Sequence, residues 1–464
     1  MKPMSLSALA NACNGTLNGD DLRITSVQTD TRSLTGDLEG VLFIALRGEN
    51  FDAHDHLQAA YDAGIRSALV SRPVAIEGLS TVLVGDTELS LAAIATSVQS
   101  HRQSKVIAIT GSNGKTSVKT LTESVLREAG ETYATPGNRN NEIGMPLAVI
   151  AAPESTEFAI YEMGTGKPGD IRYLTQIAQP NVALVNNVAP AHMERMGSLL
   201  AIADTKAAVY DDLRPQGVAI INADDAFAPY FADRAHGHRI VRFGLINNAD
   251  VTASDVELDA DGSRFTLKTP IGDAAVELSF PGEHNVRNAC AAAAIALGLG
   301  IGLQPIVDGL RKAQQVQGRL VPMQTPQGAI LVDDSYNANP GSMAAAIQTL
   351  VRAAQAQGSK AWLVMGDMRE LGPDALAMHQ EIGRRAKAAG IERLFALGEL
   401  SAGAADAFGE GAQAFASHQE LADVLSNELN SHVRVLVKGS RGSAMDKIVR
   451  AIVPAPLNGD SHAA

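Results

Sequence analysis

The chain has 464 residues, of which 45% are hydrophobic and 19% are charged. This mixture is typical of globular proteins and, at roughly 100–200 residues per domain, predicts two to four domains. The 51 acidic residues outnumber the 38 basic ones and give a formal net charge of −13. This charge excludes the basic footprint of a nucleic-acid-binding protein and disfavours an anionic membrane surface.

Cysteine content and hydropathy exclude further classes of protein. The two cysteines, Cys13 and Cys290, are too few for a disulfide scaffold or a cysteine-only zinc site. No apolar run approaches the ~20 residues that span a bilayer, and residues 1–16 lack the apolar core of a secretory signal. We therefore expect a cytoplasmic globular protein without membrane insertion, and the features favour an enzyme.

Short apolar runs separated by turns occupy the first hundred residues. From residue 105 onward, strand-like runs alternate with helical patterns, which is typical of βαβ units and a mainly parallel sheet. The strands predicted in these two regions lie at 41–46, 67–70, 81–84, 106–110, 157–161, 181–185 and 217–221, and a helix is predicted at 116–128.

The rest of the chain predicts a β-rich segment and a further α/β region. Residues 251–278 alternate in a β fashion before an Ala-rich helix at 285–299. A short polar stretch at 314–318 then predicts a hinge. Further strands are predicted at 329–332, 360–365, 393–397 and 433–437. The fold class is therefore α/β with three domains, which we expect at residues 1–100, 101–316 and 317–464.

Residues 110–116 read TGSNGKT and lie between a predicted strand and a predicted helix. Backbone N–H groups in such a loop point at an anion, Lys115 would neutralise the β- and γ-phosphates, and the Thr116 hydroxyl would bind Mg²⁺. The general phosphate-loop pattern has glycine where this chain has Ile109, so a tight turn with a surface lysine is the alternative. The other nucleotide-binding residues predicted here are Gly111, Ser112, Asn113 and Gly114.

The loop sequence TGSNGKT resembles the nucleotide loop of the Mur ligase family, which includes the folylpolyglutamate synthetases. These enzymes join a carboxylate to an amine through an acyl phosphate made from ATP. The resemblance implies a smaller N-terminal α/β domain that holds a UDP-linked precursor and a central parallel-sheet P-loop ATPase domain. It also implies a C-terminal Rossmann-like domain. ATP and Mg²⁺ are the implied cofactors.

Three further positions resemble the metal-binding residues of the family. Glu162 ends a predicted strand near the loop, and a carboxylate there suits Mg²⁺. His192, in NNVAPAH, resembles the ligand of a second Mg²⁺, and Lys206 resembles a lysine that reacts with CO₂ to form a carbamate. Carbamylation requires the neutral amine. The alternatives are a solvated strand-end carboxylate, a surface histidine and a solvated helix lysine.

The remaining nucleotide positions follow in chain order. By resemblance, Asn285 contacts adenine, Arg319 reaches ATP from the hinge, and Asp334 lies at the ribose. Each alone could also be a helix cap or a turn residue. The loop containing Lys438 and Arg441 could bind an anionic group such as a dipeptide carboxylate, or it could be an ordinary Gly/Ser turn.

Several segments resemble one branch of the family. They read TDTR at 29–32, ALRGENFDAHD at 45–55, TPGNRNNEIG at 135–144 and DDSYNANP at 333–340. That branch adds D-alanyl-D-alanine to UDP-N-acetylmuramoyl-tripeptide, the last cytoplasmic step of peptidoglycan precursor synthesis. The implied substrate residues are Thr31, Arg32, Arg47, His54, Asn141 and Asn337, together with Lys438 and Arg441. We expect these two substrates as the partners of a monomer.

Two other interpretations stay open from the sequence. A P-loop NTPase switch or regulatory binding module would explain Lys115 and Thr116, but not the ordered set that runs from His192 to Asp334. A nearer alternative is another Mur ligase or a folate-type ligase. Residues 164–169 read GTGKPG where many relatives have GANH, so the details of substrate binding in that segment are open.

Overall fold

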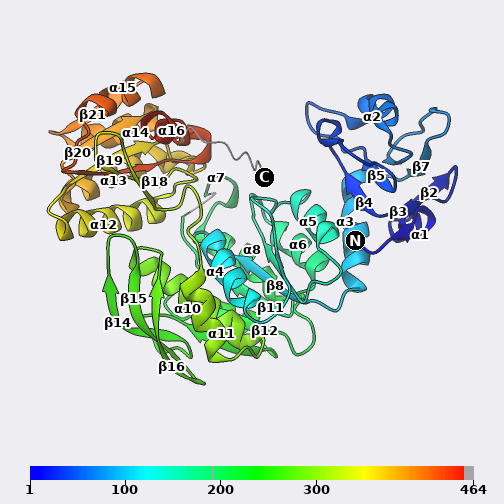
Figure 1. Ribbon diagram of the computed structural model, residues 1–464, viewed down its shortest axis with the longest axis horizontal. Helices are drawn as coiled ribbons and strands as arrows, with labels where there is room; N and C mark the ends of the chain where they lie inside the picture. The colour runs from blue at the N-terminus through cyan, green and yellow to red at the C-terminus, as the bar shows by residue number, and fades with distance from the viewer. Residues whose placement is uncertain (191–192, 454–464) are drawn as a thin grey trace.

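A computed structural model describes residues 1–190 and 193–453, and Figure 1 shows three α/β units arranged along the chain. In the central unit, the described residues form a six-stranded sheet in the order β13-β12-β11-β8-β10-β9. All its neighbouring strands are parallel, as predicted. The strands are β8 (Lys105–Thr110), β9 (Thr132–Ala134), β10 (Phe158–Glu162), β11 (Val182–Val185), β12 (Val218–Asn222) and β13 (Arg239–Phe243).

Helices cover both faces of the central sheet, because its strands bury side chains on both sides. Ile107 and Ile109 of β8 share a buried cluster with helices α4, α10 and α11. Val106 and Ala108 point the other way, into a cluster with α5, α6 and α8. The helices of this unit are α4 (Lys115–Arg127), α5 (Gly144–Ala151), α6 (Asp170–Ala178), α7 (Met193–Met196), α8 (Leu199–Ala207), α9 (Ala228–Arg234), α10 (Glu283–Gly298) and α11 (Leu303–Lys312).

The predicted β-rich segment forms an antiparallel sheet of three strands, β14 (Thr252–Leu258), β15 (Ser263–Thr269) and β16 (Gly272–Leu278). Its buried residues, such as Phe265 and Val276, join the cluster that contains α10 and α11. In Figure 1 the β14–β15 end of this sheet points toward helix α12 (Pro340–Ala356) of the C-terminal unit. The small sheet therefore lies beside the seam, which is the interface between the central unit and the C-terminal unit.

The N-terminal unit contains a five-stranded sheet in the order β2-β7-β6-β5-β4 and a two-stranded pair, β1-β3. Its last helix, α3 (Thr87–Ser100), packs against α5 and α6 of the central unit through a shared buried cluster. The predicted boundary near residue 100 stays a prediction. The other elements are β1 (Met4–Ser5), α1 (Leu6–Ala12), β2 (Thr16–Asn18), β3 (Arg23–Ile24), β4 (Ser26–Gln28), β5 (Val41–Ile44), α2 (Leu57–Ala63), β6 (Ser67–Val70) and β7 (Ser80–Leu83).

The described part of the C-terminal unit forms a six-stranded sheet in the order β17-β18-β22-β19-β20-β21, parallel except for edge strand β17. Helices α12, α13 and α14 pack on one face, and α15 and α16 on the other. Apart from α12, the strands and α-helices of this unit are β17 (Val321–Gln324), β18 (Ile330–Asp334), β19 (Lys360–Gly366), α13 (Ala375–Ala389), β20 (Arg393–Leu397), α14 (Glu399–Phe408), β21 (Ala412–Phe415), α15 (His418–Glu428), β22 (Val433–Lys438) and α16 (Asp446–Ile452).

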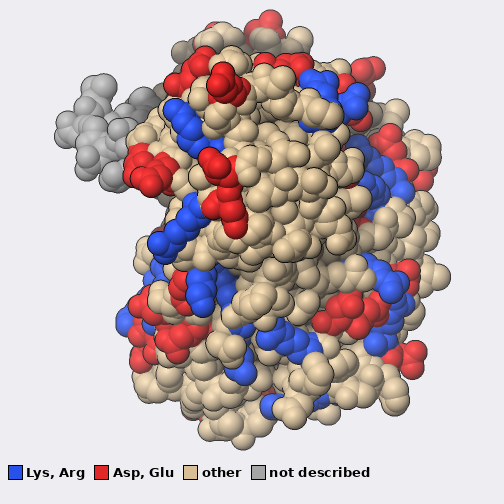
Figure 2. Space-filling view, turned by 90° about the vertical axis from the view of Figure 1, so that its right-hand side faces the viewer, with Lys and Arg blue, Asp and Glu red and all other residues tan. Residues whose placement is uncertain are grey.

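The surface in Figure 2 carries charges of both signs, and the described helices are limited in length and hydropathy. Figure 2 views the molecule from the right-hand side of Figure 1, where basic and acidic side chains are interspersed around a broad uncharged area. Within the described part of the chain, no helix combines the length and hydropathy that would be needed to cross a bilayer.

Candidate functional site

A cavity of about 590 Å³ lies between the central and C-terminal units. On the central side it is lined by loops that follow β8, β10 and β11, at the carboxyl ends of these parallel strands. Open α/β sheets bind ligands at this edge. On the other side it is lined by residues 319–320, by the segment that follows β18 and by the start of α12. The predicted residues that line it are Ser112, Asn113, Gly114, Lys115, Asn141, Glu162, Asn285, Arg319, Asp334, Asn337 and Lys438.

The β8–α4 loop has the shape that an anion-binding loop requires. Gly114 has a φ of 77°, and a Cβ there would lie 2.7 Å from Asn186 Nδ2 and 2.8 Å from Asn288 Oδ1. Helix α4 begins at the next residue, Lys115, so its N-terminal N–H groups face the cavity side of the loop. Only glycine therefore fits this turn between strand and helix.

Lys115 folds back over the loop, where its Nζ donates to the carbonyl oxygen of Gly111 at 2.8 Å. Burial lowers the pKa of Lys115, Glu162 opposes this shift, and Arg319 adds to it. An ammonium that is held by one carbonyl in a cavity has remaining donors for an anionic ligand.

Glu162 and Thr116 meet at the end of β10. Thr116 Oγ1 donates to Glu162 Oε2 at 3.0 Å, and Asn140 Nδ2 donates to Glu162 Oε1 at 2.9 Å. Burial alone would raise the pKa of Glu162, but Lys119, whose Nζ lies 3.4 Å from Oε2, and Lys115 outweigh it and hold this pKa below its ordinary value. The carboxyl group is therefore an anion at neutral pH.

Lys119 and Asn140 were not among the predicted site residues. Lys119 lies one helical turn after Lys115 on α4, so its spacing places it on the same face. Its Nζ also donates to the carbonyl oxygens of Thr135 and Gly137. Asn140 lies in the segment 135–144, which resembles one branch of the family, but that resemblance implies no role for this residue. Helical spacing could have identified Lys119, whereas nothing local indicated Asn140.

The donor set at Thr116 and Glu162 fits a hard divalent cation. A hydroxyl and an ionised carboxylate are adjacent, and both are oxygen ligands of the kind that Mg²⁺ prefers. Arg319 Nη2 donates to the same hydroxyl at 2.8 Å, so the C-terminal unit touches this point directly. The described residues contain no group of three His, Cys, Asp or Glu side chains arranged to hold a metal ion. His192, the predicted ligand of a second Mg²⁺, lies outside the described residues.

Lys206 lies near the end of α8 and is 2% exposed. Burial, followed by the positive charge of Lys115, lowers the pKa of Lys206 well below its ordinary value. Among the described residues, none forms an ion pair with its ammonium group. A buried lysine with a lowered pKa spends more of its time as the neutral amine, which is the form that reacts with CO₂.

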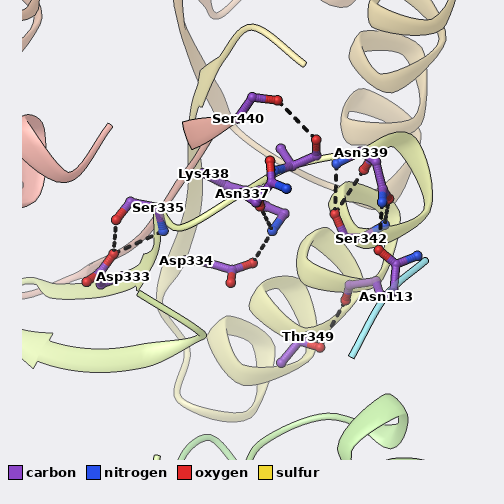
Figure 3. A network of polar contacts seen from close by, with 12 residues as sticks. Asn113, Asp333, Asp334, Ser335, Asn337, Asn339, Ser342, Thr349, Lys438 and Ser440 are labelled. Carbon is purple, nitrogen blue, oxygen red and sulfur yellow. Dashed lines mark hydrogen bonds and ion pairs between the residues drawn. The ribbon is translucent and has the colours of Figure 1, made fainter. Parts of the chain in front are cut away.

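The C-terminal wall contains the predicted residues Arg319, Asp334 and Lys438. The guanidinium of Arg319 stacks on Tyr336 at 4.4 Å from the ring centre. Lys438 Nζ donates to Asp334 Oδ2 at 2.6 Å and to the carbonyl oxygen of Asn337 at 2.8 Å (Figure 3). The Lys438 ammonium is therefore shared between two protein groups. Burial raises the pKa of Asp334 against the opposing effect of Lys438.

Asn285 belongs to a chain of amides at the start of α10. Its Nδ2 donates to the carbonyl oxygen of Pro281, and its Oδ1 accepts from Asn288. Asn288 Oδ1 in turn accepts from Asn186 Nδ2 at 3.1 Å. Sequence reasoning missed Asn186 and Asn288, which connect α10 to the β8–α4 loop, the predicted phosphate loop. Beside them, burial, Lys438 and Arg287 lower the pKa of His284 to about 4.

Four predicted substrate residues do not line the cavity, because they belong to the N-terminal unit. Thr31 and Arg32 are in a short 3-10 helix, and Arg32 forms an exposed ion pair with Asp30. Arg47 is exposed. The ring of His54 is buried, with Nδ1 2.6 Å from an Asp52 carboxylate oxygen and Nε2 accepting from the backbone of Ser71.

Arg441 and Asn141 lie at the edges of the site. Arg441 is exposed and its guanidinium lies 5.4 Å from the ring centre of Tyr336, on which Arg319 also stacks. It does not line the cavity. Asn141 does, and its Oδ1 accepts from the backbone N–H of Gly144 at the start of α5. The structure therefore gathers most of the predicted nucleotide residues around one cavity. Among the described residues, the predicted ones that do not line it are Gly111, Thr116, Lys206, Arg441 and those of the N-terminal unit.

Family models match two parts of the chain, and relatives match nearly its full length. Residues 109–296 match the Mur ligase middle domain, and residues 318–441 match the Mur ligase glutamate ligase domain. The UDP-N-acetylmuramoyl-tripeptide–D-alanyl-D-alanine ligase of Escherichia coli is 40% identical over 97% of this chain and 99% of its own length. The enzyme of the same name from Bacillus subtilis is 33% identical, over 97% of this chain and 98% of its own length.

Solved structures show the same likeness. A crystal structure of MurF from Acinetobacter baumannii superposes with a TM-score of 0.91 at 34% identity, covering 97% of this chain and 99% of the other. MurF from Thermotoga maritima in complex with ADP gives a TM-score of 0.81 at 25% identity and covers 92% of this chain and 96% of its own.

Proposed function

The chain belongs to the Mur ligase family, and we propose that it joins D-alanyl-D-alanine to UDP-N-acetylmuramoyl-tripeptide in an ATP-dependent reaction of peptidoglycan precursor synthesis. The supporting observation is the contact of Arg319 with Thr116 across a cavity that the phosphate loop also lines. Relatives over nearly the full length carry the name of this ligase. The enzyme is accordingly an ATP-dependent amide ligase.

The loop and Lys115 are positioned to bind the phosphates of ATP. The first turn of α4 supplies backbone donors, and Lys115 supplies positive charge where charge develops on the transferred group. A carboxylate oxygen of the tripeptide attacks the γ-phosphorus, the bond to ADP breaks, and an acyl phosphate forms. The amine of the dipeptide then attacks the acyl carbon, loses a proton, and inorganic phosphate leaves.

Thr116 and Glu162 would hold Mg²⁺, which supplies positive charge against the phosphate oxygens when it is bound. The lowered pKa of Glu162 keeps its carboxylate ionised at neutral pH. Lys119 and Asn140 orient that carboxylate from two sides. Arg319 reaches the same hydroxyl, so the C-terminal unit adds its charge where the phosphates would lie.

Lys206 is proposed to act as its carbamate. Its burial and lowered pKa support a population of neutral amine, and the product would be an anion able to bind a second cation. His192 is the proposed co-ligand by family resemblance, and it lies outside the described residues.

The UDP-linked substrate is proposed to lie along the N-terminal unit, near Thr31, Arg32 and Arg47. His54 would stabilise the N-terminal unit there and not contact the substrate, because both of its ring nitrogens are engaged by protein groups. The dipeptide would enter on the C-terminal side, near Asn337 and Arg441. We propose a cytoplasmic location, supported by the dependence of the reaction on ATP and a nucleotide-linked precursor, and a monomer.

The test is product analysis by mass spectrometry, combined with a phosphate-release assay. The purified chain is given ATP, Mg²⁺, a panel of UDP-linked muramoyl peptides and a panel of amino acids and dipeptides. We expect phosphate release only when UDP-N-acetylmuramoyl-tripeptide and D-alanyl-D-alanine are both present, with one new amide bond in the product.

Two outcomes would contradict this proposal. Phosphate release without either acceptor would indicate an NTPase switch, and preference for glutamate or another single amino acid would indicate a different ligase of the family. The panel should include tripeptides ending in lysine and in diaminopimelate, so that the preferred third residue is identified.

A further inference from the structure

Asn339 connects the start of α12 to the phosphate loop. Its Oδ1 accepts from the backbone N–H of Ser342 at 2.9 Å, and its own backbone N–H donates to Ser342 Oγ at 3.0 Å, which makes a capping box. The remaining Nδ2 donates to Asn113 Oδ1 at 2.7 Å. One side chain therefore caps the helix and also crosses the seam between the two units (Figure 3).

The C-terminal unit holds Asn339 firmly in place. Lys438 Nζ, at the end of β22, donates to the carbonyl oxygen of Asn337 at 2.8 Å. Ser440 Oγ donates to the carbonyl oxygen of Ala338 at 3.1 Å. Figure 3 shows these contacts on the segment that leads directly into Asn339. These contacts therefore attach the segment before Asn339 to the end of β22 and the residues that follow it.

Asn113 is held equally well by the central unit. Its backbone N–H donates to Asn187 Oδ1 at 2.8 Å. Its carbonyl oxygen accepts from Asn186 Nδ2 at 3.0 Å and from Asn187 Nδ2 at 3.1 Å. Because the backbone of Asn113 is engaged on the central side, its side chain is the part that is directed across the seam.

The amide pair suits a site for anions. A carboxylate at either position would repel bound phosphate, and a second ammonium would compete with Lys115 for it. Two neutral amides can form a hydrogen bond across the seam without either effect. Arg319 also donates a hydrogen bond across the seam, to Thr116 in the first turn of α4.

We propose that Asn339 is a positioning residue for nucleotide use: its amide holds Asn113, and so sets the geometry of the phosphate loop when the C-terminal unit lies against it. The proposal rests on the proposed function in one respect, the binding of ATP at this loop. Asn339, the N-cap residue of α12, thereby has a role in ligand binding in addition to capping the helix.

The principal test is the variant Asn339→Ser. Serine is a good N-cap residue, so α12 keeps its cap, but its hydroxyl is too short to reach Asn113. Binding of a non-hydrolysable ATP analogue with Mg²⁺ is measured by calorimetry, and the ATP dependence of turnover by kinetics. We expect a dissociation constant and a KM for ATP that rise about three- to tenfold, as for loss of one hydrogen bond.

The matched control is Ser417→Ala, which removes the cap of α15 in the same unit, a hydrogen bond from Glu420 N–H at 3.2 Å. It should leave analogue affinity and the KM for ATP unchanged. An Asn339→Ser variant that binds the analogue like the wild type would overturn the proposal. So would a Ser417→Ala variant with the same loss of affinity, because that would attribute the effect to helix stability.

A double-mutant cycle with Asn113→Ala isolates the contact. If the two side chains act through each other, Asn339→Ser has little further effect on affinity in the Asn113→Ala background, whereas additive losses overturn the coupling. Analogue binding is measured without peptide substrates, so it tests Asn339 even if the chain forms a different amide bond from the one proposed. Failure of the wild type to bind the analogue would overturn both proposals.

Discussion

Arg434, on an interior strand of the C-terminal sheet, forms an ion pair with Asp261 in the β14–β15 turn of the central unit. The Nη2–Oδ1 distance is 3.3 Å, and the arginine side chain is 2% exposed whereas the aspartate is largely exposed. Gln357 accepts a second hydrogen bond from the same guanidinium. A buried cation is thus paired across the seam at a point distant in sequence from the phosphate loop.

We expect Asp261→Asn to lower the midpoint of thermal unfolding by about 2 °C, because an exposed partner contributes at most about 1 kcal/mol. The variant keeps a side-chain oxygen but loses the charge that Arg434 faces. The difference from the wild type should shrink in about 1 M salt, which screens exposed charges. Asp273→Asn, an exposed change on the same small sheet, is the control and should not shift the midpoint. A difference that is insensitive to salt would contradict this assignment.

His284 should make stability depend on pH. Burial, Lys438 and Arg287 lower its pKa from 6.5 to about 4. Between these values the unfolded chain binds a proton that the folded chain does not, so stability rises with pH across this window and is lost as pH falls through it. When the pH is lowered from about 7 to about 5, we expect the midpoint of thermal unfolding to fall less for His284→Gln than for the wild type.

The control for His284 is His236→Gln, at an exposed position in the same unit. That variant should follow the wild-type curve of thermal midpoint against pH. If His284→Gln and His236→Gln gave the same curve, the pH dependence would have to come from other groups.

Lys115→Ala should reduce turnover to below about a tenth of the wild-type rate, a barrier increase of more than ~1.4 kcal/mol. The reason is the loss of the ammonium that lies over the loop at the carbonyl of Gly111. Initial rates of phosphate release measure the effect. Lys105→Ala, an exposed change at the start of β8, is the control for loss of a lysine and should retain activity. Higher residual activity in Lys115→Ala would remove this residue from the mechanism.

Lys206→Ala should abolish most activity by removing the proposed carbamate. Bicarbonate or a short carboxylate should partly rescue the variant by supplying an anion in the vacated space, whereas Lys206→Glu should restore little because its carboxylate reaches less far. A crystal structure with nucleotide bound would show the modification directly. Near-normal activity of Lys206→Ala, or an unmodified ammonium in that crystal, would contradict the carbamate.

Local sequence determined much of the fold and the centre of the site. The run at 106–109 is apolar throughout because β8 is buried on both faces, and glycine at 114 is required by the turn into α4. The edge strands β9, β13, β17 and β21 were not predicted. These strands are short and, except for two residues of β13, only partly buried or exposed, so their sequences lack a clear apolar pattern.

The tertiary structure alone decided which side chains meet. Asn339 and Asn113 are 226 residues apart, and Lys438 and Asp334 are 104 apart. Their motifs indicated separate roles, but the chain path makes Asn339 a contact of the phosphate loop and engages Lys438 with its neighbours. Propensity and periodicity act over a few residues, so sequence determines strands, helices and glycine turns. Contacts across the seam depend on how completed units pack, which no local pattern encodes.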